Sequence, residues 1–536
     1  MSHRSKVGLP AAAVLAILAT FMVALSLPSP GGAAPPGCAN RTNTTYKALL
    51  DCVTLEGVRA HQAALQAIAD ANGGTRAAAT PGYDASVDYV VETLEGAGWS
   101  VELHQFDFTV AEPIQQLTPL PPVTHESGDV SGSALGTVTA AVVPVDINLT
   151  PPRANTSGCD GAFTEAAVGD PLTADPAGPD DFAGFPDGAI ALIQRGGCSF
   201  ALKVANAQTA GAGAVILFNQ GNTPERSGLL TNITAEPPPL SAFTTITVPV
   251  VGASFAAGEL LARPGSTATV SVVNEPQTNV IAELDGRNDD NVVMAGAHLD
   301  SVVEGPGIND NGSGSAALLE TAVMIAKVKP ENTLRFAWWG AEEAGLVGST
   351  AYVEDLSEAE LGRIAMYMNY DMVGSPNYVT MVYDADVSTF PAPSGVSIPA
   401  GSTAIEDLYE SYYTMIGEPY DDTEFSGRSD YQAFIENDIP SGGLFTGAEE
   451  IKTAEQQAIW GGTTGAQFDP CYHQACDTFA NNNDHVLEVN SDLIAFAALT
   501  FAFSTQSVNG VPGRSVPGSS SITLPAPAGP EGTFEP

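Results

Sequence analysis

Hydrophobic and polar positions divide the chain into regions of different periodicity. Residues 53–71 and 86–97 carry apolar positions at helical spacing, and each run stops at or near glycine. The stretch 99–110 then alternates in the manner of a strand. From about 111 to 276, short Val-, Ile- and Thr-rich runs alternate with Gly and Pro, which predicts a mainly β unit. From 277 to about 505, strand, loop and helix patterns alternate, as is typical of an α/β sheet flanked by helices.

The two ends of the chain carry different signals. Arg4 and Lys6 precede an uncharged apolar run of 17 residues and then small residues, so residues 1–34 are predicted to be a cleaved secretory signal peptide. An uncleaved membrane anchor is the alternative, although the run is short for a span. We expect no other segment to cross a bilayer. The end of the chain, residues 509–536, is rich in Pro, Gly and Ser, and is predicted to be disordered or a removable extension.

The excess of acidic over basic residues restricts the kinds of molecule that this protein is expected to bind. The 536 residues include 19 Lys and Arg against 62 Asp and Glu, a net charge of −43, and 44% are hydrophobic. Such a chain can bury a core and has room for two or three domains. Nucleic acid and anionic membranes are excluded as partners because phosphate binding needs clustered Lys and Arg. Most of the acidity is interpreted as serving solubility.

Six cysteines fit an oxidising compartment outside the cytoplasm. Sequence alone permits several pairings, and proximity along the chain favours three local ones. These are Cys38–Cys52, Cys159–Cys198 and Cys471–Cys476. Metal ligation by the last two cysteines is the competing interpretation.

Polar side chains follow three buried strand patterns in the α/β region. They are His298 and Asp300 after 291–297, Glu342 and Glu343 after 333–339, and Asp371 after 364–370. Ligands of open α/β sheets collect beyond the carboxyl ends of the strands, so we expect these side chains to converge. So many carboxylates would need a cation between them.

Two loops add further candidates. Asp310 lies in a glycine-rich loop that opens a predicted helix over 316–328, and the glycines would let the backbone bring it toward the strand ends. Capping that helix is the alternative role. Tyr472 and His473 lie between two cysteines, where a small disulfide loop would hold them in place.

This ligand set suits zinc. Two imidazoles, one central carboxylate and two flanking ones match a pair of zinc ions, each with one His, one acid and a shared Asp. Calcium takes oxygen ligands and is a poor match. Only His485 competes with His473, and it is predicted to be a solvated loop residue. Neighbouring Glu342 and Glu343 cannot both point at one metal, so one should bind it and the other accept a proton.

These residues resemble the secreted double-zinc aminopeptidases of streptomycetes and vibrios, whose relatives include glutamate carboxypeptidase II and transferrin receptor. The similar blocks are AHLDS at 297–301, GINDNGSG at 307–314, GAEEAGLVGS at 340–349, NYDM at 369–372, CYHQACDT at 471–478, and shorter ones at 427–430 and 442–448. Residues 195–200 and 207–216 resemble a protease-associated domain.

The resemblance implies a three-layer α/β/α zinc exopeptidase domain with a mixed central sheet. That domain would comprise residues 35–112 and 277–508, split around a mainly β protease-associated domain at 113–276.

The resemblance also implies the role of each site residue. One zinc would be bound by His298 and Asp371 and the other by Glu343 and His473, with Asp310 bridging. Glu342 would be the general base that deprotonates the metal-bridging water, Asp300 would orient His298, and Tyr472 would donate to the tetrahedral oxyanion.

The implied activity is removal of large apolar residues such as Leu from peptide or protein N-termini, by a secreted monomer. Met372 and Phe445 would line the side-chain pocket, although plain core positions are the alternative. Arg428 would contact substrate or form a structural ion pair. Calcium binds some relatives, but no set of acids here could be matched to it.

Two other functions compete. A carboxypeptidase of the glutamate carboxypeptidase II type holds substrate carboxylates with several arginines, whereas Arg363 and Arg428 are the only ones between residue 339 and the tail. A receptor-like binding protein without catalysis would have lost metal ligands, whereas every ligand position is filled here.

Overall fold

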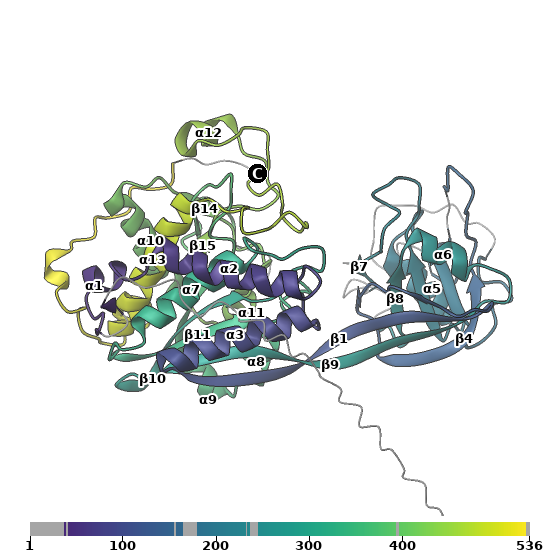
Figure 1. Ribbon diagram of the computed structural model, residues 1–536, viewed down its shortest axis with the longest axis horizontal. Helices are drawn as coiled ribbons and strands as arrows, with labels where there is room; N and C mark the ends of the chain where they lie inside the picture. Colours follow the sequence, from purple (N-terminus) through teal and green to yellow (C-terminus); the bar gives the residue numbers. More distant parts are fainter. Residues whose placement is uncertain are drawn as a thin grey trace, which may run out of the picture.

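The structure is a computed structural model that describes residues 37–38, 41–154, 157–163, 180–231, 233–235, 245–392 and 396–531. The predicted signal peptide, residues 1–34, lies outside the described residues. Figure 1 shows a larger lobe and a smaller lobe joined by two long strands.

The connection between the lobes is an antiparallel ribbon of β1 (Ser100–Thr118) and β9 (Thr267–Leu284). Ser100 pairs with Glu283 at one end and Thr118 with Thr267 at the other, with two register shifts between them. The domain limits predicted near residues 112 and 276 therefore fall inside two continuous, paired strands.

The sheet of the larger lobe is mixed, as predicted. Its other strands are β10 (Asn288–His298), β11 (Asn332–Trp339), β12 (Ile364–Tyr370), β13 (Met381–Tyr383), β14 (Asp421–Thr423) and β15 (Ser441–Phe445). The order is β14-β13-β15-β12-β10-β11-β9. β10 runs parallel to both β11 and β12, whereas β9 runs antiparallel to β11. The carboxyl ends of β10, β11 and β12 consequently meet at one edge.

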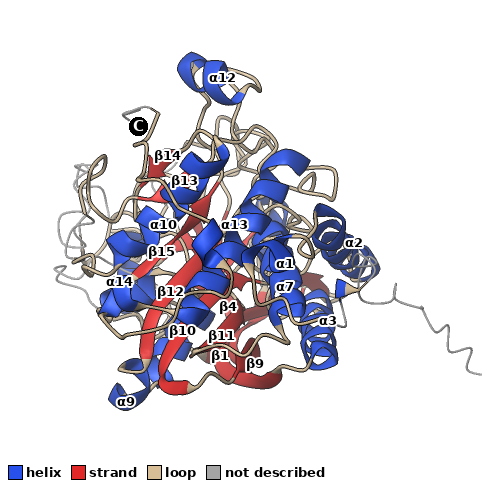
Figure 2. Cartoon of the chain, turned by 90° about the vertical axis from the view of Figure 1, so that its left-hand side faces the viewer, coloured by secondary structure: helices blue, strands red, loops and turns tan. Residues whose placement is uncertain are grey.

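Helices cover both faces of this sheet (Figure 2). They are α1 (Tyr46–Leu50), α2 (Leu55–Ala71), α3 (Pro81–Ala97), α7 (Gly312–Ile325), α8 (Val347–Asp355), α9 (Glu358–Leu361), α10 (Ser402–Ile416), α11 (Gln432–Glu436), α12 (Ala454–Trp460), α13 (Asp484–Phe503) and α14 (Gln506–Asn509). One apolar core joins the sheet to α2, α3, α7, α10 and α13, and another joins it to α8 and α11. The three-layer α/β/α architecture is thus confirmed.

Capping interactions set both ends of α3. Residues 86–97 were predicted to be helical, but α3 begins five residues earlier because the Thr80 side chain caps the nitrogen of Tyr83 and Pro81 opens the first turn. It ends as predicted at Gly98, which adopts a left-handed conformation.

In the smaller lobe the strand order continues from β9 through β4 to β5, β6 and β8. Its elements are β2 (Val123–His125), β3 (Val130–Ser131), β4 (Gly136–Pro144), β5 (Ile190–Gln194), α5 (Phe200–Thr209), β6 (Ala214–Phe218), β7 (Ile233–Thr234), β8 (Val250–Ala253) and α6 (Phe255–Leu261). Strands β4, β5, β6 and β8 are parallel, and their apolar side chains form cores separate from those of the larger lobe. This lobe can therefore bury its own hydrophobic surface.

All three predicted disulfides are confirmed: Cys38–Cys52, Cys159–Cys198 and Cys471–Cys476. The interpretation of the last pair as metal ligands was wrong. One expectation about membranes needs qualification, because α13 is long and apolar enough to span a bilayer by length and composition. Its apolar window is 78% buried inside the larger lobe, which identifies α13 as a core helix.

Residues 509–536 were predicted to be disordered or a removable extension, whereas residues 509–531 lie against the larger lobe as irregular chain with one short 3-10 helix, η2 (Ser519–Ser521). Val516 is buried and belongs to the same core as α13. Arg514 forms an ion pair with Glu331, and the nitrogen of Gly529 donates to the Tyr420 hydroxyl at 2.8 Å. Composition hid this packing because a few isolated apolar and charged residues fix the segment.

Candidate metal centre

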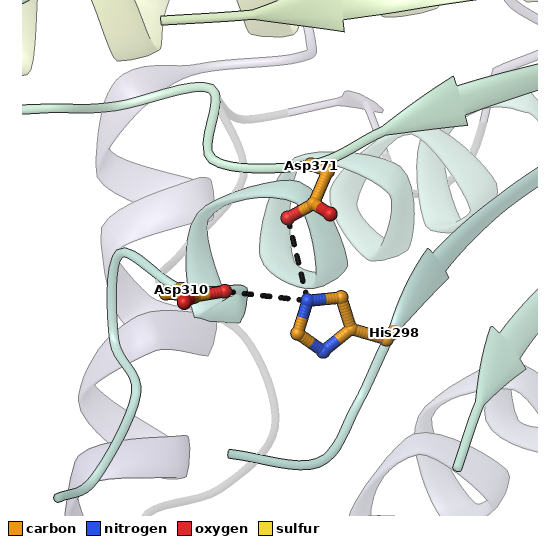
Figure 3. Close-up of side chains that lie close together, drawn as sticks. All are labelled: His298, Asp310 and Asp371. Atoms are coloured by element: carbon orange, nitrogen blue, oxygen red, sulfur yellow. Dashed lines mark ion pairs between the residues drawn. The ribbon is translucent and has the colours of Figure 1, made fainter. Parts of the chain in front are cut away.

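The predicted convergence of side chains beyond the strands is confirmed. His298 is the last residue of β10, Glu342 and Glu343 follow β11, and Asp371 follows β12 directly. Asp310 comes from the loop before α7, as Figure 3 shows for three of these side chains. The alternative role of Asp310 as a helix cap was wrong, because Asn311 caps α7.

One half of the centre is formed by His298, Asp310 and Asp371 (Figure 3). Nε2 of His298 lies 3.3 Å from Oδ1 of Asp310 and 3.3 Å from Oδ1 of Asp371. All three side chains are buried. Nε2 of His298 and Oδ1 of Asp371 have no hydrogen-bond partner, which is costly for buried polar atoms unless a ligand fills the space between them.

The other half is formed by Asp310, Glu343 and His473. Nε2 of His473 lies 3.4 Å from Oδ2 of Asp310 and 2.9 Å from Oε2 of Glu343. Asp310 therefore turns one carboxylate oxygen to each half. The bridging role that the resemblance implies for Asp310 would use these two oxygens.

The donor atoms fit zinc. Two donors that each lie about 2.0–2.1 Å from a tetrahedral zinc ion are about 3.3–3.4 Å apart. Three of the four separations across the two halves match that value, at 3.3, 3.3 and 3.4 Å. Each half combines one imidazole with carboxylate oxygens, which is a zinc-type set.

Burial and neighbouring charges shift the pKa values of the side chains in the centre. Burial would raise the pKa of Asp310, but the imidazoles of His298 and His473 hold it well below the usual range. Burial and the charge of Asp310 raise the pKa of Glu343 to about 7. Burial would lower the pKa of His473, but its two carboxylate neighbours raise it to about 10. The bridging carboxylate is thus held in the ionised form that a metal requires.

Glu342 is buried beside the metal ligands without belonging to either ligand set. Its Oε2 lies 3.8 Å from Nε2 of His298, and its side chain lines the cavity at the centre. Burial raises the pKa of Glu342 well above the usual range of glutamate. A carboxylate in this setting has the raised proton affinity that a general base needs.

Asp300 lies beside His298, which the resemblance implies it orients. The hydrogen-bond partner of Nδ1 of His298 is the backbone oxygen of Asp300 at 3.2 Å, and Oδ1 of the Asp300 carboxylate lies 3.6 Å from the same nitrogen. The same carboxylate accepts hydrogen bonds from the backbone nitrogens of Glu342 at 3.1 Å and Glu343 at 3.3 Å. Asp300 is itself buried, so it ties the end of β10 to the turn that carries both glutamates.

Two positioning residues were missed by sequence reasoning, although both lie in motif blocks that it singled out. The Asp477 carboxylate accepts from the backbone nitrogens of Asn309 at 2.8 Å and Asp310 at 2.9 Å, and so fixes the loop that bears the bridging ligand. The Ser429 hydroxyl donates to Oδ2 of Asp371 at 2.6 Å. The sequence did offer one signal for each residue, because Asp477 directly follows Cys476 and Ser429 directly follows Arg428.

The disulfide loop presents its two residues to the centre as expected. The rings of Tyr472 and His473 stack at 3.8 Å between centroids. The Tyr472 hydroxyl accepts from Nη2 of Arg428 at 3.0 Å, and Nη1 of Arg428 contacts Glu449 at 2.9 Å. Arg428 therefore forms an ion pair with Glu449 and also lines the cavity. The rival His485 lies in the first turn of α13, exposed and 3.3 Å from Glu418.

A cavity of about 130 Å³ opens over the centre. Its wall includes Met372, Tyr383 and Phe445 beside the metal ligands and Glu342. Met372 is buried, and Phe445 is partly buried at the end of β15. The cavity thus places an apolar surface next to a group of carboxylates.

Comparison with known proteins matches each lobe separately. Residues 279–498 match peptidase family M28, and residues 138–261 match the PA domain. These ranges correspond to the larger and the smaller lobe.

Similar whole proteins agree with these matches. An aminopeptidase of Pseudomonas aeruginosa is 46% identical over 471 residues, which cover 85% of this chain and 83% of that protein. A probable leucine aminopeptidase 2 of Aspergillus fumigatus is 44% identical over 331 residues, covering 60% of this chain and 63% of that protein. The solved structure of a zinc aminopeptidase from Bacillus subtilis is 25% identical and has a TM-score of 0.57, covering 82% of this chain and 94% of its own.

Proposed function

We propose a function that starts from a premise the comparisons establish: this chain belongs to peptidase family M28 and is a metallo-aminopeptidase. We propose that two zinc ions serve its active site. We propose also that the enzyme releases large apolar residues such as leucine from the amino ends of peptides. The observation that carries the two-zinc proposal is the position of Asp310. Its two oxygens face two separate sets of ligands, with His298 in one and His473 in the other.

The residues of the centre divide the chemistry of peptide hydrolysis among them. Bound zinc supplies a Lewis acid and lowers the pKa of water at the site. Glu342 accepts the proton of the water whose oxygen attacks the scissile carbonyl carbon, and it returns that proton to the leaving amine as the C–N bond breaks. Tyr472 donates its hydroxyl hydrogen bond to the oxyanion of the tetrahedral intermediate. Arg428 positions that hydroxyl.

Recognition of a free amino end follows from the charges around the cavity. An N-terminal ammonium beside the metals would find carboxylates in Glu342 and Asp371, both of which line the cavity. The side chain of the first residue would lie against Met372 and Phe445, which favours a large apolar group. The name of the fungal relative, a probable leucine aminopeptidase, supports this preference.

The competing functions are less well supported. A carboxypeptidase needs cations for the substrate carboxylate, yet the cavity wall contains one arginine, Arg428, which already contacts Glu449. A receptor-like binding protein would not need a complete ligand set with a buried base beside it. We propose further that the enzyme acts outside the cytoplasm after secretion, as three disulfides suggest, and acts as a monomer on peptide or protein N-termini.

The test is hydrolysis of leucine p-nitroanilide and its N-acetylated analogue by the purified protein, before and after chelation. We expect turnover of the free-amine substrate only, lost on chelation and restored by zinc, with two zinc ions per chain in the active form. Equal turnover of the acetylated substrate would refute aminopeptidase action.

The role of Glu342 is tested by Glu342→Gln. This variant should lose activity by about 10²–10⁴-fold, because the proton acceptor is removed, while its zinc content measured by mass spectrometry stays unchanged. Retained activity would remove Glu342 as the base.

A further inference from the structure

A second group of acids lies behind the wall of the cavity, away from the zinc ligands. We call it the acidic cluster, and it comprises Asp384, Asp386, Glu406, Glu410 and Asp422. Glu406 and Glu410 are one turn apart on α10, Asp422 lies on β14, and the first two residues follow β13. Glu406 offers oxygens to two overlapping triads, one with Asp384 and Asp386 and the other with Glu410 and Asp422.

The inner triad is buried and lacks compensating charge. Glu406, Glu410 and Asp422 are 3%, 8% and 4% exposed. Among the described residues, no Lys, Arg or His forms an ion pair with any member of the acidic cluster. Oδ1 of Asp422 is buried without a hydrogen-bond partner. Its Oδ2 is held by the hydroxyls of Ser388 and Thr389, which orients the unpartnered oxygen within the triad.

Three buried carboxylates without a counter-charge are costly, so the triad must take up protons or a cation. Burial, reinforced by the neighbouring carboxylates, raises the pKa of Glu406 to about 9 and that of Glu410 to about 8. Protonation of one or two members would supply hydroxyl donors to the neighbouring carboxylate oxygens, but it would leave the remaining negative charge buried without a counter-charge. A bound cation would use the same oxygens and would also satisfy the unpartnered one.

We propose that Glu406, Glu410 and Asp422 bind a calcium ion. The set contains oxygen donors only, which excludes the zinc-type preference seen at the other centre and favours a hard cation. Calcium accepts six to eight oxygens in a flexible arrangement, as three carboxylates from a helix and a strand would offer. Asp386 is exposed at the edge of the acidic cluster and provides the route by which a hydrated ion would enter.

The position of this ion would connect it with the peptidase site. β14 ends at Thr423, and the chain from Thr423 to Ser429 lines the cavity over the zinc ligands. Ser429 in turn donates to Asp371. A calcium ion that joins α10 to β14 would therefore hold one wall of the cavity in place, and its removal should weaken substrate binding more than the chemical step.

Binding is tested on the full-length zinc-loaded protein in calcium-free buffer, with calcium alone as the probe. Titration calorimetry and terbium luminescence measure binding without reference to activity. We expect one calcium ion per chain, magnesium binding that is much weaker, and a melting temperature raised by about 3–5 °C at a calcium concentration 100 times the dissociation constant. Absence of calcium binding below millimolar concentration, or equal binding of magnesium, would overturn the proposal.

Two variants make the assignment specific. Glu410→Gln should weaken calcium binding at least about tenfold, because one ligand charge is removed. Asp407→Asn is the matched control, since it removes a charge from an exposed position of the same helix that acts on Glu410 only through space, and it should weaken calcium binding much less than Glu410→Gln. Identical affinities of the two variants would refute the site. If Glu410→Gln does not fold, Asp422→Asn removes the charge of another member of the same ligand set, and unchanged affinity there would count against the proposal.

A kinetic readout separates the calcium effect from the zinc centre. Calcium should lower KM for leucine p-nitroanilide with little change in kcat, and the effect should be absent from Glu410→Gln. An inactive enzyme that still binds calcium would refute the proposed function and leave the calcium site standing.

Discussion

Replacing Asp300 by Asn tests whether one buried carboxylate holds both Glu342, the proposed base, and Glu343 in place. In the wild type, this carboxylate accepts from the backbone nitrogens of Glu342 and Glu343 and lies 3.6 Å from Nδ1 of His298. Asn keeps one oxygen but turns an NH₂ group toward the second backbone nitrogen. One hydrogen bond to a charged acceptor is lost, and one N–H group remains without an acceptor.

The size of the effect follows from these contacts. A hydrogen bond to a charged group contributes about 1.5–3 kcal/mol, and the penalty for the buried N–H that loses it is of the same size, so we expect the free energy of unfolding to fall by about 1.5–3 kcal/mol. Loss of a partner behind a metal-binding histidine typically weakens metal affinity or activity by about 10–100-fold. We expect zinc affinity and kcat/KM each to fall within that range.

The assay combines urea unfolding, zinc competition with a fluorescent chelator and kcat/KM on leucine p-nitroanilide. Glu320→Gln is the control because Glu320 is equally buried, 3% exposed, and contacts His61 on α2, outside the zinc centre. It should lose stability without losing zinc affinity. The reasoning fails if Asp300→Asn loses stability as the control does yet keeps its zinc affinity and kcat/KM within twofold of the wild type.

Three further predictions concern the pocket, the disulfide loop and the acidic cluster. Phe445→Ala should lower kcat/KM for leucine relative to alanine substrates by about tenfold or more, because apolar contact in the pocket is lost; equal losses on both substrates would remove Phe445 from the pocket. Replacing both Cys471 and Cys476 by Ser should cost only about 2 kcal/mol of stability in denaturant melts, because the loop is short, but should reduce kcat/KM more strongly than that loss explains. Since the folded-state pKa values of Glu406 and Glu410 are raised to about 9 and 8, their neutral forms favour the folded state at low pH. Without calcium, the melting temperature should therefore fall as pH rises from 5 to 9, and the increment given by calcium should grow over the same range; a pH-independent increment would contradict this.

The convergence of these side chains could be predicted from the sequence because each of them follows a recognisable element. Strand ends deliver His298 and Asp371, and the glycine-rich loop delivers Asp310. Local patterns of this kind mark the place of a side chain in a parallel sheet before the fold is known. The distances from Asp310 to His298 and His473, in contrast, depend on the packing of segments far apart in the chain.

The features that sequence reasoning missed have no local signature. The acids of the acidic cluster come from the loop after β13, from α10 and from β14, where each could equally be a solvated surface residue. The packing of the tail depends on single residues such as Val516 that meet a distant core. The double role of Asp300 was hidden because its partners are backbone nitrogens, which carry no sequence identity.

The ribbon of β1 and β9 also bears on the order in which this chain folds. It pairs Thr118 with Thr267, while α2 and α3 pack on α7, which comes later in the chain than the whole smaller lobe. Closing an unstructured loop of about 150 residues costs about 4 kcal/mol of chain entropy. Because the smaller lobe has cores of its own, its early folding would bring the two halves of the ribbon together and remove most of that cost. Early folding of the inserted lobe would therefore hold together the two chain segments that form the domain it interrupts.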